Sequence, residues 1–200
     1  YVFTQYHPNE WGSITSLLTP TGIQATSDGK VYASTSGGVL EFDLQTKRFN
    51  FIKIEQGLKY LDLSTIEIDN KGRLWLGGAQ PNGCLQVYDP NVGLVKYFDD
   101  DLIVSINNIQ IGNNRAYLSY KGSASGDIGI LEFLFDSDDL PIYKDYYINF
   151  SNNSAINDIR DLDLYNDSLY ITTDQGIFAA NYKQDNLKSS ENWLQIFSGE

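Results

Sequence analysis

Residues 66–78 read IEIDNKGRLWLGG, and residues 83–90 read GCLQVYDP. Three other segments of the 200-residue chain keep this order of features: an apolar run, a turn rich in Gly, Asn or Asp, an aromatic residue, and a second apolar run after a connector. The aromatic residues of the four segments are Tyr32, Trp75, Tyr117 and Tyr170, spaced by 43, 42 and 53 positions. A repeat with a period near 43 residues therefore organises the chain.

Each repeat has the pattern of β-strands. Its apolar residues alternate with polar ones or form short runs bounded by Gly, Asn and Asp, which favours strands over helices. The turns at 27–30, 70–73 and 112–115 contain Gly or Asn, which tolerate the positive φ of tight hairpins. Four antiparallel strands in about 40 to 50 residues predict a β-propeller blade. A β-sandwich or an up-and-down barrel is the alternative, although neither requires one motif at a fixed phase.

The length of the repeat, compared with the length of the chain, predicts an all-β fold that consists of a single β-propeller region with about four blades. We expect a leader strand at 1–19 and blades at 20–62, 63–105, 106–155 and 156–200. Propellers have about four to eight blades and need each blade face covered by a neighbour. We therefore expect the amino-terminal part of a larger, seven- or eight-bladed ring, in which the remaining blades of the parent chain cover the open faces.

The second repeat has a specific resemblance. Residues 69–78 (DNKGRLWLGG), followed by Gly83 and by residues 87–90 (VYDP), resemble the repeat of the two-component-regulator propellers, and residues 56–62 (QGLKYLD) look like its connector. The other repeats match in part, and Tyr117 replaces the Trp in the third. The resemblance implies an exported bacterial protein of the periplasm, cell surface or secreted fraction. Periplasmic sensor regions of hybrid two-component systems and the PorZ-type propeller of the type IX secretion system are examples.

Charge and composition exclude several classes of function. The chain has 14 basic and 26 acidic residues and a net charge of −12. This balance argues against nucleic-acid binding, which needs clustered Lys and Arg, and against docking on an anionic membrane. A single Cys excludes an internal disulfide, and a single His excludes any mechanism that needs two imidazoles. No apolar run is long enough for insertion into a membrane.

The candidates for chemistry are few, and no cofactor motif is present. Cys84 is expected to be a buried, inert thiol, since a nucleophile needs a base and an electropositive setting, and His7 is expected to be a surface residue. Calcium at Asp99–Asp101 or at 136–139 is a weaker alternative to solvated acidic turns, because neither segment has a closing Glu. Two carboxylates facing each other could hydrolyse a glycoside, but spacing along the chain does not show such a pair.

These observations favour a non-enzymatic, extracytoplasmic propeller that senses a ligand or binds a glycan, a protein or a peptide. The alternative is a carbohydrate-active enzyme, a hydrolase or lyase, with acidic residues at the channel mouth. On a propeller, connectors between the second and third strands and between blades share one face, and loops carry function. The candidate ligand-binding residues of that face are Tyr60, Gln80, Asn82, Asp99, Asp100, Asp101, Tyr120, Lys121, Ser123, Ser125, Asp127, Asn152 and Asn153.

Overall fold

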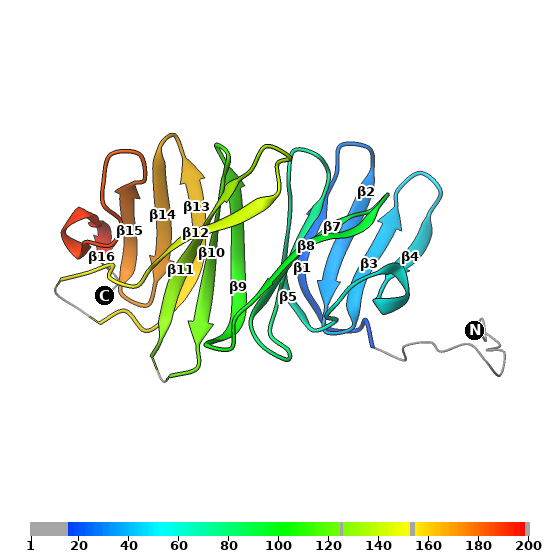
Figure 1. The fold of residues 1–200 in the computed structure, drawn as a ribbon, viewed down its shortest axis with the longest axis horizontal. Helices are drawn as coiled ribbons and strands as arrows, with labels where there is room; N and C mark the ends of the chain where they lie inside the picture. Colours follow the sequence, from blue (N-terminus) through cyan, green and yellow to red (C-terminus); the bar gives the residue numbers. More distant parts are fainter. Residues whose placement is uncertain (1–15, 125, 153–154, 199–200) are drawn as a thin grey trace.

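A computed structural model describes residues 16–124, 126–152 and 155–198 (Figure 1). Within these ranges the chain forms sixteen β-strands and two short 3₁₀-helices, η1 (Ile54–Gln56) and η2 (Ser190–Asn192). No helix of the described part is long and apolar enough to cross a membrane. The expected all-β class is therefore confirmed. Most of the expected leader strand, residues 1–15, and His7 with it, lies outside the described ranges.

The strands form four separate antiparallel sheets, each with its strands in chain order. Sheet 1 contains β1 (Pro20–Ala25), β2 (Lys30–Thr35), β3 (Gly38–Asp43) and β4 (Arg48–Ile52). Sheet 2 contains β5 (Leu63–Ile68), β6 (Leu74–Gly78), β7 (Cys84–Asp89) and β8 (Gly93–Asp99). Sheet 3 contains β9 (Ile103–Gly112), β10 (Arg115–Gly122), β11 (Ile128–Phe135) and β12 (Pro141–Tyr147). Sheet 4 contains β13 (Ile159–Tyr165), β14 (Ser168–Thr173), β15 (Gly176–Asn181) and β16 (Leu194–Ser198).

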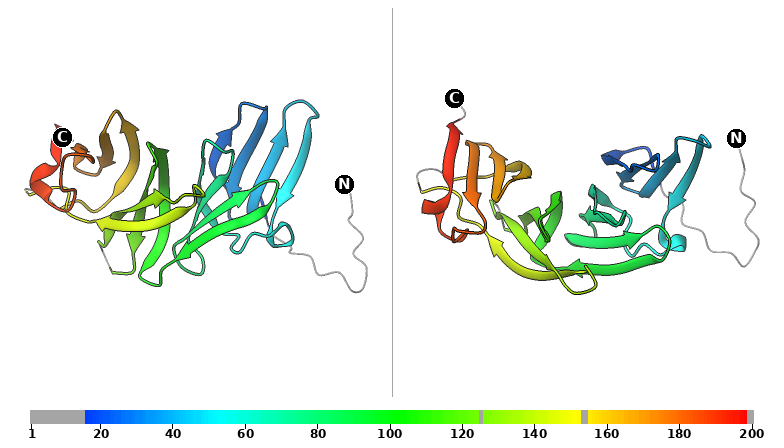
Figure 2. Two further views of the ribbon diagram at one scale, coloured as in Figure 1. Left: turned by 45° about the horizontal axis from the view of Figure 1, so that its top comes forward. Right: turned by 90° about the horizontal axis from the view of Figure 1, so that it is seen from above.

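These sheets are propeller blades rather than parts of a barrel or a sandwich. They follow one another along an arc, with the first strand of each sheet on the inner side and the fourth on the outer side (Figure 2). Four separate four-stranded sheets are the arrangement of a propeller, whereas a barrel is one closed sheet and a sandwich is two facing sheets. Sheet 3 begins at Ile103, ahead of the expected boundary at residue 106.

The turn in the motif of sheet 2 explains its sequence. Asp69 Oδ1 accepts hydrogen bonds from the backbone N–H of Lys71 (2.9 Å) and of Arg73 (3.0 Å), and Gly72 takes the positive φ of 77° that the turn requires. Asp69 Oδ2 accepts from Arg73 Nε (2.7 Å) and from Trp75 Nε1 (3.0 Å). The Asp, Gly and Trp of the motif therefore form one buried hydrogen-bonded unit that fixes the β5–β6 hairpin.

The period of the sequence reappears as contacts between neighbouring inner strands. Gln24 Nε2 donates to Glu67 Oε2 (2.8 Å), and Gln110 Nε2 donates to Asp163 Oδ1 (3.1 Å). These four residues occupy the same position in successive repeats, 43 to 53 residues apart. Equivalent residues therefore lie on the first strands of the sheets and join sheet 1 to sheet 2 and sheet 3 to sheet 4.

The core is divided into three apolar clusters, each between two neighbouring sheets. Tyr32 is buried between sheets 1 and 2, Trp75 between sheets 2 and 3, and Tyr117 between sheets 3 and 4. Leu169 and its neighbours on β14 pack toward sheet 3, so Tyr170 points to the opposite side and is only half-buried. The repeated aromatic residue thus packs against the following sheet wherever the described chain supplies one.

The face of sheet 1 that points away from sheet 2 is apolar and uncovered by any described residue. Strand register places Ile23, Val31, Ala33, Leu40, Phe42, Phe49 and Phe51 on it. Leu74 and Leu76 hold the positions of Val31 and Ala33 in the next repeat, and both are fully buried against sheet 1. Phe49 and Phe51 are about half exposed. Sheet 1 therefore has the surface chemistry of a blade that another sheet covers.

Candidate binding groove between the second and third sheets

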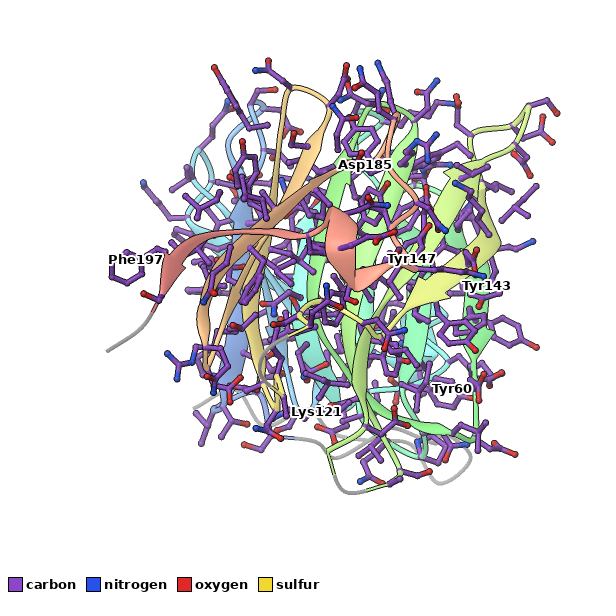
Figure 3. All side chains as sticks on the ribbon, turned by 90° about the vertical axis from the view of Figure 1, so that its left-hand side faces the viewer. Tyr60, Lys121, Tyr143, Tyr147, Asp185 and Phe197 are labelled. Atoms are coloured by element: carbon purple, nitrogen blue, oxygen red, sulfur yellow. The ribbon has the colours of Figure 1, made fainter. Side chains whose placement is uncertain are left out.

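The connectors that were expected to share one face do lie together, at what we call the loop end of the sheets. Asn82 Nδ2 donates to Asp101 Oδ1 (2.6 Å), which joins the β6–β7 connector to the segment between sheets 2 and 3. The backbone N–H of Ser123 donates to the carbonyl of Leu102 (2.9 Å). Lys121 and Tyr60 lie toward this end of the molecule and Asp185 toward the other (Figure 3).

Tyr60 is held in place by its neighbours. Its hydroxyl donates to Asp99 Oδ2 (2.7 Å), which also accepts from Lys59 Nζ (3.2 Å). Lys59 Nζ lies 3.4 Å from the centre of the Tyr97 ring, a cation–π contact. The hydrogen bonds from Tyr60 and Lys59 lower the pKa of the Asp99 carboxyl, so it stays ionised. Buried Gln86 fixes the backbone here, since its Nε2 donates to the Tyr60 carbonyl (2.9 Å).

The acidic segments build turns. Asp100 Oδ1 accepts from the backbone N–H of Leu102 (2.8 Å), and Asp136 Oδ1 accepts from those of Asp138 and Leu140 (2.8 Å each). Backbone contacts of this kind are the ordinary role of Asp in turns. Among the described residues, no group of three or more His, Cys, Asp or Glu side chains could hold a metal ion.

Some residues that were expected in the loops of one face lie in other parts of the structure. Tyr120 was expected in the connector of the third repeat, but it belongs to β10 and is only 7% exposed, with its ring over Gly129. The strand extends to Gly122 because Lys121 and Gly122 still pair with β9. Asn152 accepts a hydrogen bond from Ser190, between β15 and β16, and so contacts sheet 4. Gln80 is exposed in the β6–β7 connector. Ser125 and Asn153 lie outside the described residues.

A pocket of about 360 Å³ lies between sheets 2 and 3 beside the loop end. It contains three of the expected residues, Asp100, Tyr120 and Asp127, together with side chains that the sequence did not single out. The lining residues are Phe98, Asp100, Leu102, Ile103, Tyr120, Asp127, Leu131, Tyr143, Tyr146 and Ile148. Tyr143 and Tyr146 come from the outer strand β12 and are 43% and 48% exposed.

A second, more apolar pocket of about 220 Å³ shares Phe98 and Tyr143 with the first. The two rings are stacked with their centres 5.8 Å apart. The pocket is lined by Leu85, Val87, Lys96, Tyr97, Phe98, Phe133, Pro141, Ile142 and Tyr143. Together the two pockets form what we call the groove, which runs between β8 and β12 on the outer side of sheets 2 and 3.

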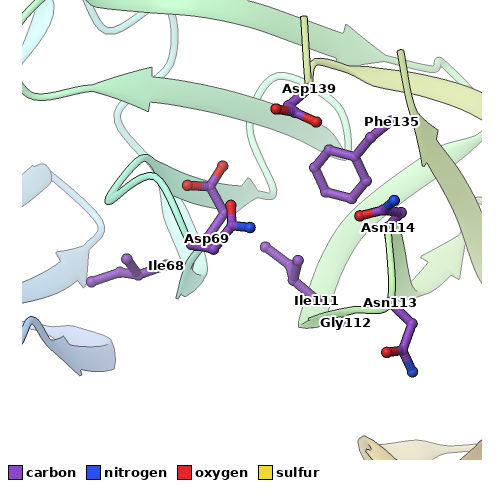
Figure 4. A pocket seen from close by; sticks show the side chains of 9 residues that line it. Ile68, Asp69, Ile111, Gly112, Asn113, Asn114, Phe135 and Asp139 are labelled. Carbon is purple, nitrogen blue, oxygen red and sulfur yellow. The ribbon is translucent and has the colours of Figure 1, made fainter. Parts of the chain in front are cut away.

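One pocket at the other end of the sheets has carboxylates that are already paired (Figure 4). It has a volume of about 250 Å³ and is lined by Ile68, Asp69, Asn70, Ile111, Gly112, Asn113, Asn114, Phe135 and Asp139. Both oxygens of Asp69 are occupied by the hairpin unit described above, and Asp139 forms an ion pair with Lys71. The carboxylates of Asp69 and Asp139 are therefore already paired with groups of the hairpin turns.

Cys84 is a free thiol that is fully buried at the start of β7. Burial, followed by the nearby Asp99 charge, raises the pKa of this thiol to about 12. At neutral pH the sulfur therefore stays protonated, which removes its value as a nucleophile. The structure agrees with the interpretation of Cys84 as a packing residue.

No family model matches the chain, and no curated protein sequence matches it. Solved structures do. The extracellular domain of BT4673 from B. thetaiotaomicron, described as a hybrid two-component system, is 14% identical, with a TM-score of 0.61 over 95% of this chain. PorZ of the type IX secretion system of Porphyromonas gingivalis is 14% identical, with a TM-score of 0.51 over 87%. The gluconolactonase XC5397 from Xanthomonas campestris is 9% identical, with a TM-score of 0.58 over 80%.

The chain spans about a quarter of the length of the BT4673 domain, 28% of PorZ and 58% of the gluconolactonase. The first two are the kinds of protein that the sequence motif resembles. At these identities the likeness shows the fold and leaves the function to the site. The described residues of this chain form four consecutive blades of a β-propeller.

Proposed function

We propose that the chain belongs to a non-enzymatic propeller module outside the cytoplasm, and that it binds a glycan or protein ligand in the groove between sheets 2 and 3. The observation that carries the proposal is the groove itself. It combines exposed tyrosines on a rigid strand with two carboxylates, and polar groups set among aromatic side chains are typical of ligand sites. The extracellular origin of the BT4673 domain and the surface location of PorZ support the location.

We further propose that the apolar face of sheet 1 is covered by another β-sheet, from the remaining blades of the same protein. Support comes from the equivalent faces of sheets 2, 3 and 4, each of which is buried against the preceding sheet. The partner sheet is expected to present a face with a large aromatic residue, since Tyr32, Trp75 and Tyr117 are the repeated residues that pack against the following sheets.

Replacing Tyr143 and Tyr146 together by alanine is expected to weaken ligand binding by the full protein at least about tenfold, because the two rings supply most of the exposed aromatic surface of the groove. Glycan and peptide arrays probed with the wild-type protein identify the ligand, and titration calorimetry measures the loss. The matched control is Tyr165→Ala, which removes an exposed tyrosine from the inner strand β13. Array ligands that bind both variants equally well, or no array ligand at all, would contradict the proposal.

The enzyme alternative is tested on the same pocket, because Asp100 and Asp127 both line it. Glycosidases use paired carboxylates, one as acid and one as base or nucleophile. We expect no release of reducing ends from a panel of polysaccharides. Release that Asp100→Asn and Asp127→Asn both abolish would replace the proposed function with a carbohydrate-active enzyme.

A further inference from the structure

The larger pocket of the groove is acidic and aromatic, and no Lys or Arg lines it. Its polar groups are the carboxylates of Asp100 and Asp127 and the hydroxyls of three tyrosines. Asp100 uses one oxygen to accept the backbone N–H of Leu102, and no described side chain pairs with its other oxygen. The Asp127 carboxylate lies against the backbone of Gly122, and no described side chain pairs with it. The pocket therefore holds negative charge that the described part of the chain does not neutralise.

Tyr120 adds a second, independent feature of the pocket. The residue is 93% buried, and no described residue forms a hydrogen bond to its hydroxyl. Every fully buried side-chain N or O atom of the described residues has a partner, so the Tyr120 hydroxyl is in contact with solvent, at the wall of the pocket. Burial, followed by the charge of Asp127, raises its pKa to about 12, so the hydroxyl stays neutral and can both donate and accept. The hydroxyl is held in a fixed place by a side chain that is otherwise buried, and no described residue competes for it. A polar atom of a ligand in the pocket can therefore form a hydrogen bond with it.

Two lysines of the chain show that an ammonium group can be bound between a tyrosine ring and a carboxylate. On one side of the pocket, Lys59 Nζ lies over the Tyr97 ring (3.4 Å) and pairs with Asp99 (3.2 Å). On the other side, Lys188 Nζ pairs with Asp145 (2.8 Å) and lies 5.8 Å from the centre of the Tyr146 ring. In both places an ammonium group sits between a tyrosine face and a carboxylate. The pocket has the same pair of groups and no internal cation.

From these contacts we propose that the pocket receives a lysine or arginine side chain of a polypeptide partner. The cationic group lies between Asp100 and Asp127 and donates a further hydrogen bond to the hydroxyl oxygen of Tyr120. The aliphatic stem packs on Tyr143 and Leu102, since Lys and Arg side chains bury their stems while the charge stays solvated. The apolar half of the groove, beyond Phe98, accommodates the neighbouring residue of an extended partner. A chain of net charge −12 favours the approach of a basic partner.

This inference rests on the proposed function, and the test separates the two. Fluorescein-labelled peptides of five lysines, five norleucines or five glutamates, and labelled maltohexaose as a neutral glycan, are titrated into the full protein by fluorescence anisotropy. We expect the lysine peptide to bind, with an affinity that falls as salt rises. Asp127→Asn and Asp100→Asn are each expected to weaken it about five- to tenfold. The matched control Asp28→Asn, at an exposed turn of sheet 1, is expected to leave it unchanged.

Three outcomes overturn the inference. Maltohexaose binding that needs Tyr143 and Tyr146 but is unaffected by Asp127→Asn would leave the groove as the ligand site and reject the basic side chain. Lysine-peptide binding that Asp28→Asn weakens as much as Asp127→Asn would mean attraction by overall charge alone. Absence of any binding that depends on groove residues would overturn the inference and the proposed function together. Circular dichroism of each variant verifies that the blades remain folded.

Discussion

Replacing Glu132 by alanine is expected to lower the free energy of unfolding by about 3–5 kcal/mol. Glu132 lies on β11 between sheets 3 and 4, and its side chain is fully buried. It accepts hydrogen bonds from Arg115, Lys144 and the hydroxyls of Tyr117 and Tyr147. Alanine would leave buried or half-buried donors without an acceptor, and that desolvation penalty is the source of the loss. Urea unfolding followed by tryptophan fluorescence at low protein concentration measures it.

The matched control for this variant is Glu41→Ala. Glu41 holds the same repeat position in sheet 1, opposite Tyr32 as Glu132 is opposite Tyr117. It has fewer partners: Asn50 Nδ2 donates to it (3.0 Å), and Lys30 Nζ lies 3.5 Å away. We expect a loss of about 1–2 kcal/mol. Equal losses for the two variants would mean that the Glu132 network contributes no more than the smaller set of contacts around Glu41.

The 200-residue chain, expressed by itself, is expected to self-associate through the apolar face of sheet 1. Covering roughly 400 Å² of apolar surface is worth about 10 kcal/mol, at about 25 cal/mol per Å². Apolar patches of that size on soluble proteins mark interaction surfaces. Sedimentation velocity over a range of protein concentrations measures the association.

Phe49→Lys combined with Phe51→Lys is expected to shift this association to at least tenfold higher concentration, because charges on the face oppose its burial. Val92→Lys is the control, since Val92 is an exposed apolar residue in the β7–β8 turn of another sheet. In the full protein, where we propose that another sheet covers the face, the association is expected to disappear. A chain that stays monomeric at every concentration would contradict the prediction, because it would show that the apolar face of sheet 1 is stable in contact with solvent.

The fold could be predicted from the sequence because each repeat has the same local pattern of apolar runs, turn residues and an aromatic residue. Alternating apolar residues give the strands, and Gly29, Gly72 and Asn113 take the positive φ that their hairpins demand. The common position of Trp75 and its equivalents marks the packing between sheets, which the clusters confirm. These features depend on residues close together in the chain, or one repeat apart, and are therefore visible as a pattern.

The groove could be predicted only in part. Asp100 and Asp127 were expected on one face, and they do line one pocket. Tyr143 and Tyr146 were missed because their exposure depends on how β12 packs beside β8, an arrangement of two sheets that neither repeat encodes alone. Tyr120 was placed in a loop because its flanking Ser and Gly residues resemble a connector, whereas pairing with β9 continues the strand to Gly122. The exposure of the β12 tyrosines and the position of Tyr120 both depend on contacts between strands and sheets rather than on the local sequence.

Hydrogen–deuterium exchange of the full protein, with and without its best array ligand, tests whether ligand occupies the groove between sheets 2 and 3. We expect slower amide exchange on ligand binding in residues 99–103, 120–124 and 141–148, which form the walls of the groove. We expect no change in the turns at 112–115 and 166–168, at the opposite end of the sheets. Slower exchange confined to those turns, or to the inner strands, would contradict the proposal that ligand binds in the groove.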